Sequence, residues 1–262
     1  MYLVGVDANA RLTALTGLLQ RDGRVEVAEA AEAFGTAEMT VRRDLDRLVA
    51  MGMARRVRGG AISLLMRGEE LPFAMRALER AEAKARIGAA VADILRDGEA
   101  VLLDSGTTSV AVGRALAGRR LTVMALSLHV ANALSAGAPG PAGESVRLLV
   151  GGGEARPGEL AMVGPIALAS IAALRFDTAV LAPCGLAAGQ ITAHDLGDAA
   201  VKQAMIAASA RVVVAADGSK FGQTAMAVVG ATDAVDMVIT DATAPGDALD
   251  ALRAAGVEVR CA

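Results

Sequence analysis

The sequence predicts an α/β protein in which a small N-terminal winged helix-turn-helix precedes a larger, mostly parallel α/β domain. Two observations lead to this prediction. Three short helical patterns and a glycine-turned hairpin pattern fill residues 1–62, and strand-like and helix-like segments alternate from Glu99 onward. The first arrangement is typical of a winged helix-turn-helix, and the second of a sheet covered by helices on both faces.

The N-terminal module begins with the pattern of three short helices. Leucines at helical spacing predict a first helix over residues 10–22, which Gly23 ends, and a second helix over residues 28–34. The third helix is predicted from Thr36, as its N-cap, to about Ala50. Its apolar side is assigned to Met39, Leu45, Leu48 and Val49.

A hairpin with its turn at Gly59 and Gly60 follows, and arginines gather on it and on the third helix. In a major groove, arginine reads guanine edges and hydroxyl groups bind phosphates. The alternative is a solvated face neutralised by Asp44 and Asp46, and Asp44 itself is expected to orient an arginine within the module. The predicted DNA-binding residues are Thr36, Thr40, Arg42, Arg43, Arg47, Arg55 and Arg58.

Two runs in this module resemble the DNA-binding signature of the DeoR family of repressors. They are Thr-Val-Arg-Arg-Asp-Leu at 40–45 and Arg-Val-Arg-Gly-Gly-Ala at 56–61. Ala37 stands where the family usually has serine, which leaves Thr36 as the N-cap, and Arg58 stands where it often has histidine. The resemblance implies a regulator of double-stranded operator DNA. A homo-oligomer, dimer or tetramer, is expected, because two recognition helices would then meet two half-sites.

Composition narrows the function classes. Residues 1–67 hold ten arginines and eight acidic residues, whereas the rest of the chain holds sixteen basic and twenty-one acidic residues. DNA contact is therefore expected of the N-terminal module alone. An aromatic share of 2% with no tryptophan argues against a base-stacking, single-strand or RNA-binding surface.

Several other classes are also excluded on sequence grounds. The apolar runs are far shorter than the ~20 residues of a membrane span, and Asp7 and Arg11 interrupt any early apolar stretch. A soluble, cytoplasmic protein without membrane contact is expected. Cys184 and Cys261 have no Cys or His at ligand spacing, so no disulfide framework, metal or cofactor is expected.

The second domain is predicted to follow a linker. Residues 63–83 are assigned to the linker and the start of a connecting helix over about 74–96, and residues 84–262 to the α/β domain. The predicted strands are 100–103, 121–125, 146–150, 178–182, 211–216, 237–240 and 257–259. Helices are predicted around 109–117, 159–173, 198–209 and 246–255.

Three glycine-containing loops follow predicted strands, where parallel sheets bind ligands. Residues 104–109 open a helix, and their glycine, hydroxyl groups and helix N-terminus suit an anion. Residues 151–153 allow close backbone approach, and residues 217–222 bring Lys220. The chain has only three lysines, which singles out Lys202 and Lys220 as positions where arginine would not serve.

The family resemblance extends through this domain, on the runs at 103–108, 149–152, 200–205 and 216–222. The DeoR-type effector domain is related in fold to ribose-5-phosphate isomerases and coenzyme A transferases, and the resemblance implies a phosphorylated sugar or polyol as effector. Leu126 stands where the family commonly has asparagine, so that only Ser127 carries over there. The predicted effector-binding residues are Asp104, Ser105, Gly106, Thr107, Thr108, Ser127, Gly151, Gly152, Lys202 and Lys220.

The leading hypothesis is a DNA-binding repressor of carbohydrate metabolism that this effector controls. A sugar-phosphate isomerase, with Asp104 as base and Lys220 stabilising an enediolate, is the first alternative. It leaves the DNA module unexplained and lacks a second well-placed carboxylate. A regulator that has lost its effector and answers to a protein partner is the second alternative, and Leu126 is the feature that favours it.

Overall fold

The computed structural model describes residues 7–64, 71–138 and 145–262. The chain forms two compact units, which divide between Glu79 and Arg80. This boundary lies inside the predicted linker 63–83, of which residues 65–70 are outside the described part. Among the helices of the described residues, none has the length and apolar character needed to cross a membrane.

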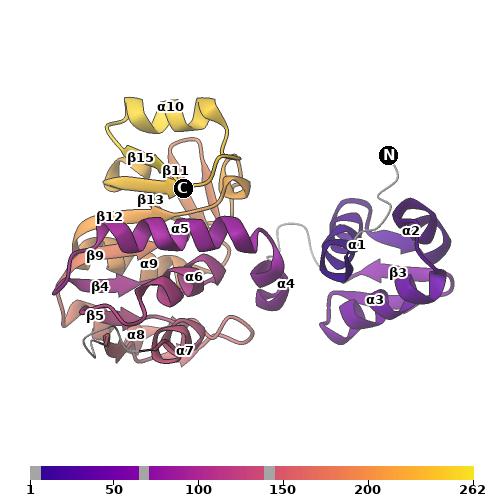
Figure 1. The fold of residues 1–262 in the computed structure, drawn as a ribbon, viewed down its shortest axis with the longest axis horizontal. Coiled ribbons are helices and arrows are strands. Elements are labelled where there is room, and N and C mark those ends of the chain that lie inside the picture. Colours follow the sequence, from indigo (N-terminus) through magenta and orange to yellow (C-terminus); the bar gives the residue numbers. More distant parts are fainter. Residues whose placement is uncertain (1–6, 65–70, 139–144) are drawn as a thin grey trace. The chain divides into compact units, whose positions relative to one another are not determined.

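The first unit combines helices with a small antiparallel sheet of strand order β1-β3-β2 (Figure 1). The predicted three helices and hairpin are confirmed, and the segment after the first helix adds a strand to the hairpin. The elements are α1 Ala8–Asp22, β1 Arg24–Glu26, α2 Val27–Phe34, α3 Glu38–Ala50, β2 Ala54–Val57, β3 Gly60–Ser63 and α4 Phe73–Leu78.

Local signals in the sequence explain these boundaries. Asp7 accepts hydrogen bonds from the backbone N–H groups of Asn9 and Ala10 and so caps α1, and Gly23 ends it in the left-handed conformation, at φ 72°. Gly60 lets β3 approach β1, because a Cβ there would lie 1.9 Å from the carbonyl oxygen of Val25. The resulting winged helix-turn-helix has its own apolar core.

The third helix differs from the prediction in two ways. It starts at Glu38 with Ala37 as N-cap and no side-chain cap, so the assignment of Thr36 as N-cap is wrong. Met39 is 67% exposed, so its assignment to the apolar side is also wrong. The buried face instead follows the helical period through Val41, Asp44, Leu45 and Leu48, and Met39 lies off that stripe.

The second unit is built on a seven-stranded sheet of order β15-β14-β12-β9-β4-β5-β6, in which every pair of neighbours is parallel. Its strands correspond to the seven predicted ones. They are β4 Ala100–Leu103, β5 Thr122–Ala125, β6 Arg147–Val150, β9 Phe176–Leu181, β12 Ser209–Ala215, β14 Met237–Thr240 and β15 Glu258–Cys261.

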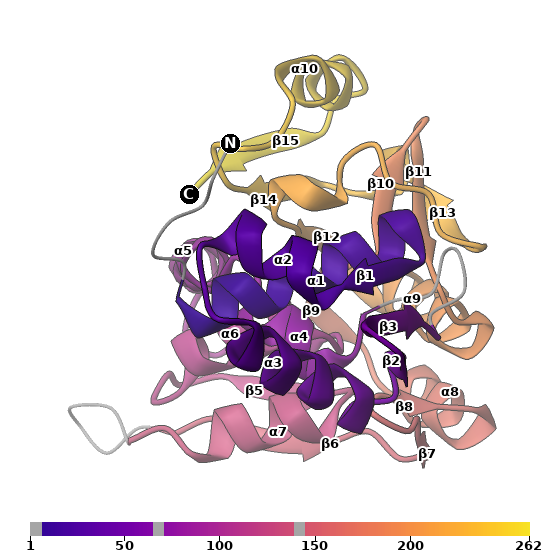
Figure 2. The same ribbon diagram turned by 90° about the vertical axis from the view of Figure 1, so that its right-hand side faces the viewer.

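Helices cover both faces of this sheet, as Figure 2 shows for α5 and α6 on one side and α8 and α9 on the other. Leu102 and Met124 pack into a core with residues of α8, α9 and α10, whereas Val101 and Val123, equally buried, point to the opposite face. The helices are α5 Ala81–Ile94, α6 Thr107–Leu116, α7 Leu128–Ser135, α8 Pro165–Ala172, α9 Leu196–Ala208 and α10 Gly246–Ala254.

Some predicted helices are shorter or divided. The helix expected over 74–96 is interrupted between α4 and α5, where Arg80 has a φ of 51°. The helix expected over 159–173 begins only at Pro165, because residues before it form a hairpin of β7 Glu154–Ala155 and β8 Met162–Val163. Two 3-10 turns also occur, η1 Gly218–Lys220 and η2 Thr232–Ala234.

A second antiparallel sheet, of order β10-β11-β13, was not expected from the sequence. Its strands are β10 Gly185–Ala187, β11 Gln190–Ala193 and β13 Ala227–Ala231.

Candidate functional site

The exposed face of α3 carries the arginines predicted to bind DNA. Arg42, Arg43 and Arg47 are exposed, and Thr40 is half-buried beside them. Arg42 pairs with Glu38 one turn earlier at 3.1 Å, whereas Arg43 has no side-chain partner among the described residues. These side chains lie opposite the buried stripe of the helix and are available to a ligand.

Asp44 has the intramolecular role that the sequence indicated. It is only 2% exposed and accepts a hydrogen bond from Arg11 Nε at 2.6 Å, while Arg47 Nη1 lies 3.8 Å from its other oxygen. This carboxylate fastens α1 to α3. It therefore holds the helix in place rather than facing a ligand.

The hairpin brings further arginines next to α3. Arg55 and Arg58 are exposed and have no side-chain partner among the described residues, whereas Arg56 pairs with Asp46 of α3 at 3.2 Å. This pair ties the wing to the helix. Thr36 lies in the turn before α3 and is half-buried.

In the second unit, the strand order reverses between β4 and β9. From β4 the chain runs through β5 and β6 to one edge of the sheet, and from β9 it runs through β12 and β14 to the other. The loops that leave β4 and β9 therefore diverge, which is where parallel sheets bind ligands. Asp104 follows β4 at this point, and its Oδ2 accepts a hydrogen bond from the backbone N–H of Ala182 beyond β9, at 2.8 Å.

Asp104 belongs to a buried charge cluster with Lys202 and Asp198 of α9. Lys202 is 1% exposed, and its ammonium donates to Asp104 Oδ1 at 3.1 Å and to both oxygens of Asp198 at 2.7 Å. The donors of Lys202 are thus engaged, and the lysine holds the two carboxylates in position. Its predicted contact with an effector remains a prediction.

The cluster shifts the pKa values of its members. Burial raises the pKa of Asp104 to about 6, even though Lys202 acts to lower it. Burial also acts to raise the pKa of Asp198, but the charge of Lys202 and its hydrogen bonds, together with the charge of Arg156 and a hydrogen bond from Ser105, hold that pKa below its usual value. Burial acts to lower the pKa of Lys202, but Asp104 and Asp198 raise it above its ordinary value.

The loop after Asp104 delivers its polar groups to the start of α6. Gly106, at φ 95°, is the N-cap residue, and no side chain caps the helix. Ser105 Oγ lies 3.4 Å from Asp198 Oδ1, so the loop and the charge cluster form one site. Thr107 and Thr108 form the first turn of α6. The structure therefore brings together Asp104, Ser105, Gly106, Thr107, Thr108 and Lys202.

The remaining predicted effector residues have packing roles in the structure. Ser127 caps α7 by accepting a hydrogen bond from the N–H of His129. A Cβ on Gly151 would lie 2.8 Å from a methyl carbon of Leu126, and one on Gly152 would lie 2.9 Å from Ile166. Leu126 itself is 1% exposed and belongs to the apolar core.

Lys220 lies at the end of η1, in the loop after β12, and is half-buried. Asp217 caps this turn by accepting from the N–H of Ser219, and Arg80 lies 3.7 Å from Asp217. Within the described residues, Lys220 has no side-chain partner.

Two residues of this region were not found from the sequence. Asp198 lies four residues before Lys202, and this helical spacing is the one signal that could have identified it. Arg156 lies in a turn without periodicity, and its charge acts on Asp198. Only the folded chain brings it to the site.

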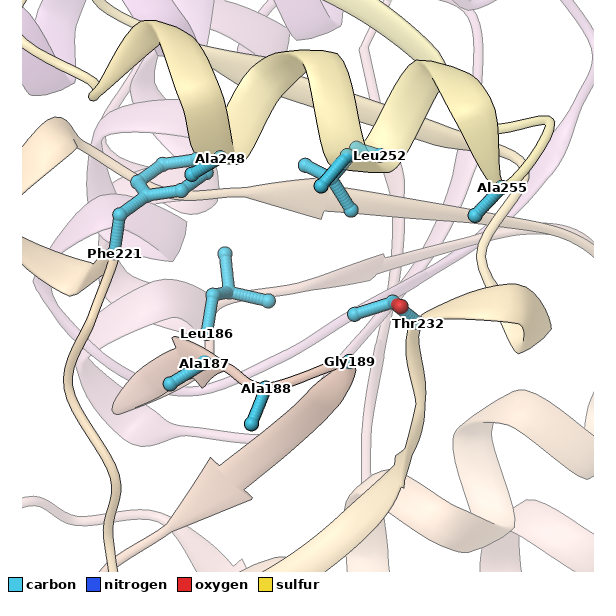
Figure 3. Close-up of a pocket in the computed structure, with 10 residues that line it drawn as sticks. Leu186, Ala187, Ala188, Gly189, Phe221, Thr232, Ala248, Leu252 and Ala255 are labelled. Carbon is cyan, nitrogen blue, oxygen red and sulfur yellow. The ribbon is translucent and has the colours of Figure 1, made fainter.

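An apolar pocket of about 220 Å³ lies elsewhere, between α10 and the β10–β11 hairpin. Figure 3 shows Leu252 of α10 and Leu186 of β10 facing each other across it. None of the predicted effector residues lines it, and its lining has no ionisable side chain, so it does not suit a phosphate. Its lining residues are Leu186, Ala187, Ala188, Gly189, Phe221, Thr232, Ala248, Ala251, Leu252 and Ala255. The described residues also contain no group of His, Cys, Asp and Glu side chains placed to hold a metal ion.

Known proteins resemble the chain along most of its length. It is 32% identical to the glycerol-3-phosphate regulon repressor of Escherichia coli over 237 residues. This alignment covers 90% of this chain and 91% of the repressor. It is 33% identical to the transcriptional repressor AccR of Agrobacterium fabrum, over 88% of each chain. It is 27% identical to the transcriptional repressor GlcR of Bacillus subtilis, over 95% of this chain and 94% of that repressor.

Among solved structures, ribose 5-phosphate isomerase A of Methanocaldococcus jannaschii matches 55% of this chain and 55% of its own, with a TM-score of 0.38 and 12% identity.

The two units correspond to two described protein families. The DeoR-like helix-turn-helix domain matches residues 11–65, and the DeoR C terminal sensor domain matches residues 79–242. Both family models and relatives of more than 30% identity thus cover most of the chain, and the chain belongs to the DeoR family of transcriptional regulators.

Proposed function

We propose that this regulator is a repressor whose sensor domain binds a phosphorylated sugar or polyol at the C-terminal ends of β4 and β9. Binding of this effector lowers the affinity of the repressor for operator DNA. The observation that carries the proposal is the loop from Asp104 to Thr108. It lies where the strand order diverges and opens α6 without a side-chain cap.

The start of α6 supports an anionic ligand. The first N–H groups of a helix have no partner within it, and the helix dipole favours negative charge there. Gly106 has no Cβ, and the nearest atom that a Cβ there would meet is 4.0 Å away, which leaves the backbone open to a phosphate. Ser105, Thr107 and Thr108 supply hydroxyl donors around the same point.

The charge cluster below the loop supports the sugar or polyol part of the ligand. Asp104 and Asp198 accept hydrogen bonds, as the hydroxyl groups of a sugar require. Lys202 neutralises one of the two negative charges, and Lys220 reaches the same edge of the sheet from β12. The relative named for a glycerol-3-phosphate regulon is consistent with a ligand of this chemistry.

In the DNA-binding domain, α3 is the recognition helix. Arg42, Arg43 and Arg47 face outward for the major groove, and Arg55 and Arg58 of the wing reach phosphates beside it. A homo-oligomer places two such helices on half-sites about one helical turn apart, ~34 Å. Effector binding favours an arrangement of subunits that no longer matches this spacing.

A thermal-shift screen of the full-length protein tests the sensor. Glycerol 3-phosphate, glucose 6-phosphate, fructose 1-phosphate and ribose 5-phosphate are each compared with the unphosphorylated compound. A ligand at 100 times its Kd adds ~2.7 kcal/mol to the free energy of unfolding, which raises the midpoint clearly. Stabilisation by a phosphorylated compound alone is the expected result. Equal midpoints for every pair would overturn the proposal for these ligands.

A further inference from the structure

The turn that joins β7 to β8 is fastened over the C-terminal edge of the sheet. Leu128 donates its backbone N–H to the carbonyl oxygen of Leu160 at 3.0 Å, and Met162 donates to Leu126 at 2.9 Å. Ser127 pairs with Ala161 as an isolated bridge. The turn is thereby held at the end of β5, the strand next to β4.

Arg156 begins this turn, and its backbone is fixed at both polar atoms. Its N–H donates to Ala161 at 2.8 Å, and its carbonyl oxygen accepts from Leu160 at 2.8 Å, where Leu160 takes a φ of 51°. Behind the turn, Val163 of β8 packs against Gly197 of α9, where a Cβ on the glycine would lie 3.4 Å from the valine Cβ. Gly197 directly precedes Asp198, so the hairpin and the charge cluster are neighbours.

The side chain of Arg156 is incompletely satisfied. Its Nε is buried and has no hydrogen-bond partner, and the guanidinium forms no ion pair with any described residue. An unmade hydrogen bond of a buried charged donor is costly. The positive charge of Arg156 acts on Asp198 and lowers the pKa of that carboxyl group. The Nε of Arg156 therefore lacks a hydrogen-bond acceptor that a ligand could supply.

The charges of the site indicate what that acceptor is. Lys202 has all its donors on Asp104 and Asp198, so it has none left for a ligand anion. Arg156 is a cation whose charge acts on Asp198 and whose Nε has no hydrogen-bond partner. Its planar fork matches the oxygens of a phosphate better than an ammonium does.

We propose that Arg156 binds the phosphate group of the effector and makes the sensor selective for phosphorylated over unphosphorylated ligands. This inference rests on the proposed effector site, and it assigns the recognition of the anion to the β7–β8 turn in addition to the start of α6. Arg156 then donates two parallel N–H bonds, one of them from the Nε that lacks a partner in the free protein.

Three variants of the full-length protein test this assignment: Arg156→Ala, Arg156→Lys and the control Arg147→Ala. Arg147 is exposed at the start of β6, at the N-terminal end of the parallel strands and so away from the turn, and has no side-chain partner among the described residues. Kd is measured by calorimetry for whichever screened compound stabilises the wild type, and for its unphosphorylated counterpart. Inorganic phosphate is titrated in parallel by thermal shift, as a probe that does not depend on the choice of sugar.

The expected result is a 10- to 100-fold higher Kd for the phosphorylated compound in Arg156→Ala, with a smaller loss in Arg156→Lys, which keeps the charge and loses the fork. Arg147→Ala keeps the wild-type value. Inorganic phosphate stabilises the wild type and Arg147→Ala more than Arg156→Ala.

Two outcomes overturn the inference. One is an unchanged Kd in Arg156→Ala, which leaves the proposed effector site standing without this residue. The other is an equal loss of phosphorylated and unphosphorylated ligands, which would make Arg156 a support for Asp198 alone. A wild type that binds none of the sugar phosphates refutes the proposed function instead, and equal stabilisation of all variants by inorganic phosphate then refutes the role of Arg156 as well.

Discussion

At the scale of single residues, the cluster of Asp104, Lys202 and Asp198 sets the charge balance of the proposed effector site. Two carboxylates share one ammonium away from water, and the balance holds only because each oxygen of Asp198 and one of Asp104 accepts from Lys202. Composition alone singled out Lys202, since lysine is rare in this chain. The charge of Lys202 is neutralised by Asp104 and Asp198 within the protein. This pairing depends on the fold, and no pattern in the sequence reveals it.

Lys202→Met is expected to destabilise the protein by about 3–5 kcal/mol, because it leaves two carboxylates buried without a cation. Lys220→Met is the matched control, since Lys220 is half-buried and has no side-chain partner among the described residues. Urea denaturation at pH 7 measures both. Equal stabilities of the two variants would contradict the structural role of Lys202.

The pKa of Asp104 predicts a dependence of stability on pH. Because that pKa is about 6 in the folded protein and 3.8 for an unperturbed aspartate, the folded chain keeps a proton between these pH values that the unfolded chain releases. The contribution of Asp104 to the free energy of unfolding is therefore complete below pH 4 and is lost as the pH rises through 6. The loss is on the order of 3 kcal/mol. The stability of the wild type relative to Asp104→Asn should fall between pH 4.5 and 7.

Asp241 provides a control of opposite sign. Burial acts to raise its pKa, but hydrogen bonds from the N–H of Gly218 and from Thr243 hold that pKa below its usual value. The stability of the wild type relative to Asp241→Asn should therefore be highest above pH 4 and decline as the pH falls further. Parallel pH profiles for the two variants, measured by denaturant titration, would contradict the assignment for Asp104.

At the scale of elements, the strands of the large sheet were predictable and the small ones were not. A strand buried on both faces of a parallel sheet is a continuous apolar run, such as residues 100–103 and 237–239, and each prediction of this kind is confirmed. The strands β7, β8 and β10 have two or three residues each, too few to show a period. The turn with Arg156 lies among them, which is why that residue was missed.

The N-terminus of α3 lacks the side-chain cap that its backbone allows. Ala37 has φ −70° and ψ 143°, an extended conformation that suits a serine cap. Ala37→Ser is expected to stabilise the helix-turn-helix by about 1 kcal/mol, seen as a raised thermal midpoint. Ala50→Ser, at the other end of the same helix, should give no gain, and an equal rise in both variants would argue against capping.

At the scale of the whole molecule, DNA is expected to bind to one unit and the effector to the other. The net charge of −3 hides a basic N-terminal module, so DNA binding should depend on the arginines of α3 rather than on overall charge. Which unit binds which ligand follows from the sequence motifs. The site at the ends of β4 and β9 required the strand order, which only the folded chain provides.

The double variant Arg42→Ala/Arg43→Ala should lose specific DNA binding while it keeps its thermal midpoint, because both side chains are exposed and neither contacts the core. Arg21→Ala, on an exposed part of α1, removes a charge from the same unit and should bind DNA as the wild type does. Fluorescence anisotropy with DNA selected from a random pool measures the affinity. Unfolding of the double variant would show that these arginines are structural.

The most direct test of the central claim is the affinity of the full-length protein for that selected DNA, with and without the sugar phosphate that stabilises it. The phosphorylated compound is expected to weaken DNA binding by about 5- to 150-fold, corresponding to a coupling of ~1–3 kcal/mol between the two sites. The unphosphorylated compound should leave the affinity unchanged. A DNA affinity that stays the same when the protein is saturated with this ligand would contradict the proposed control of DNA binding by the effector.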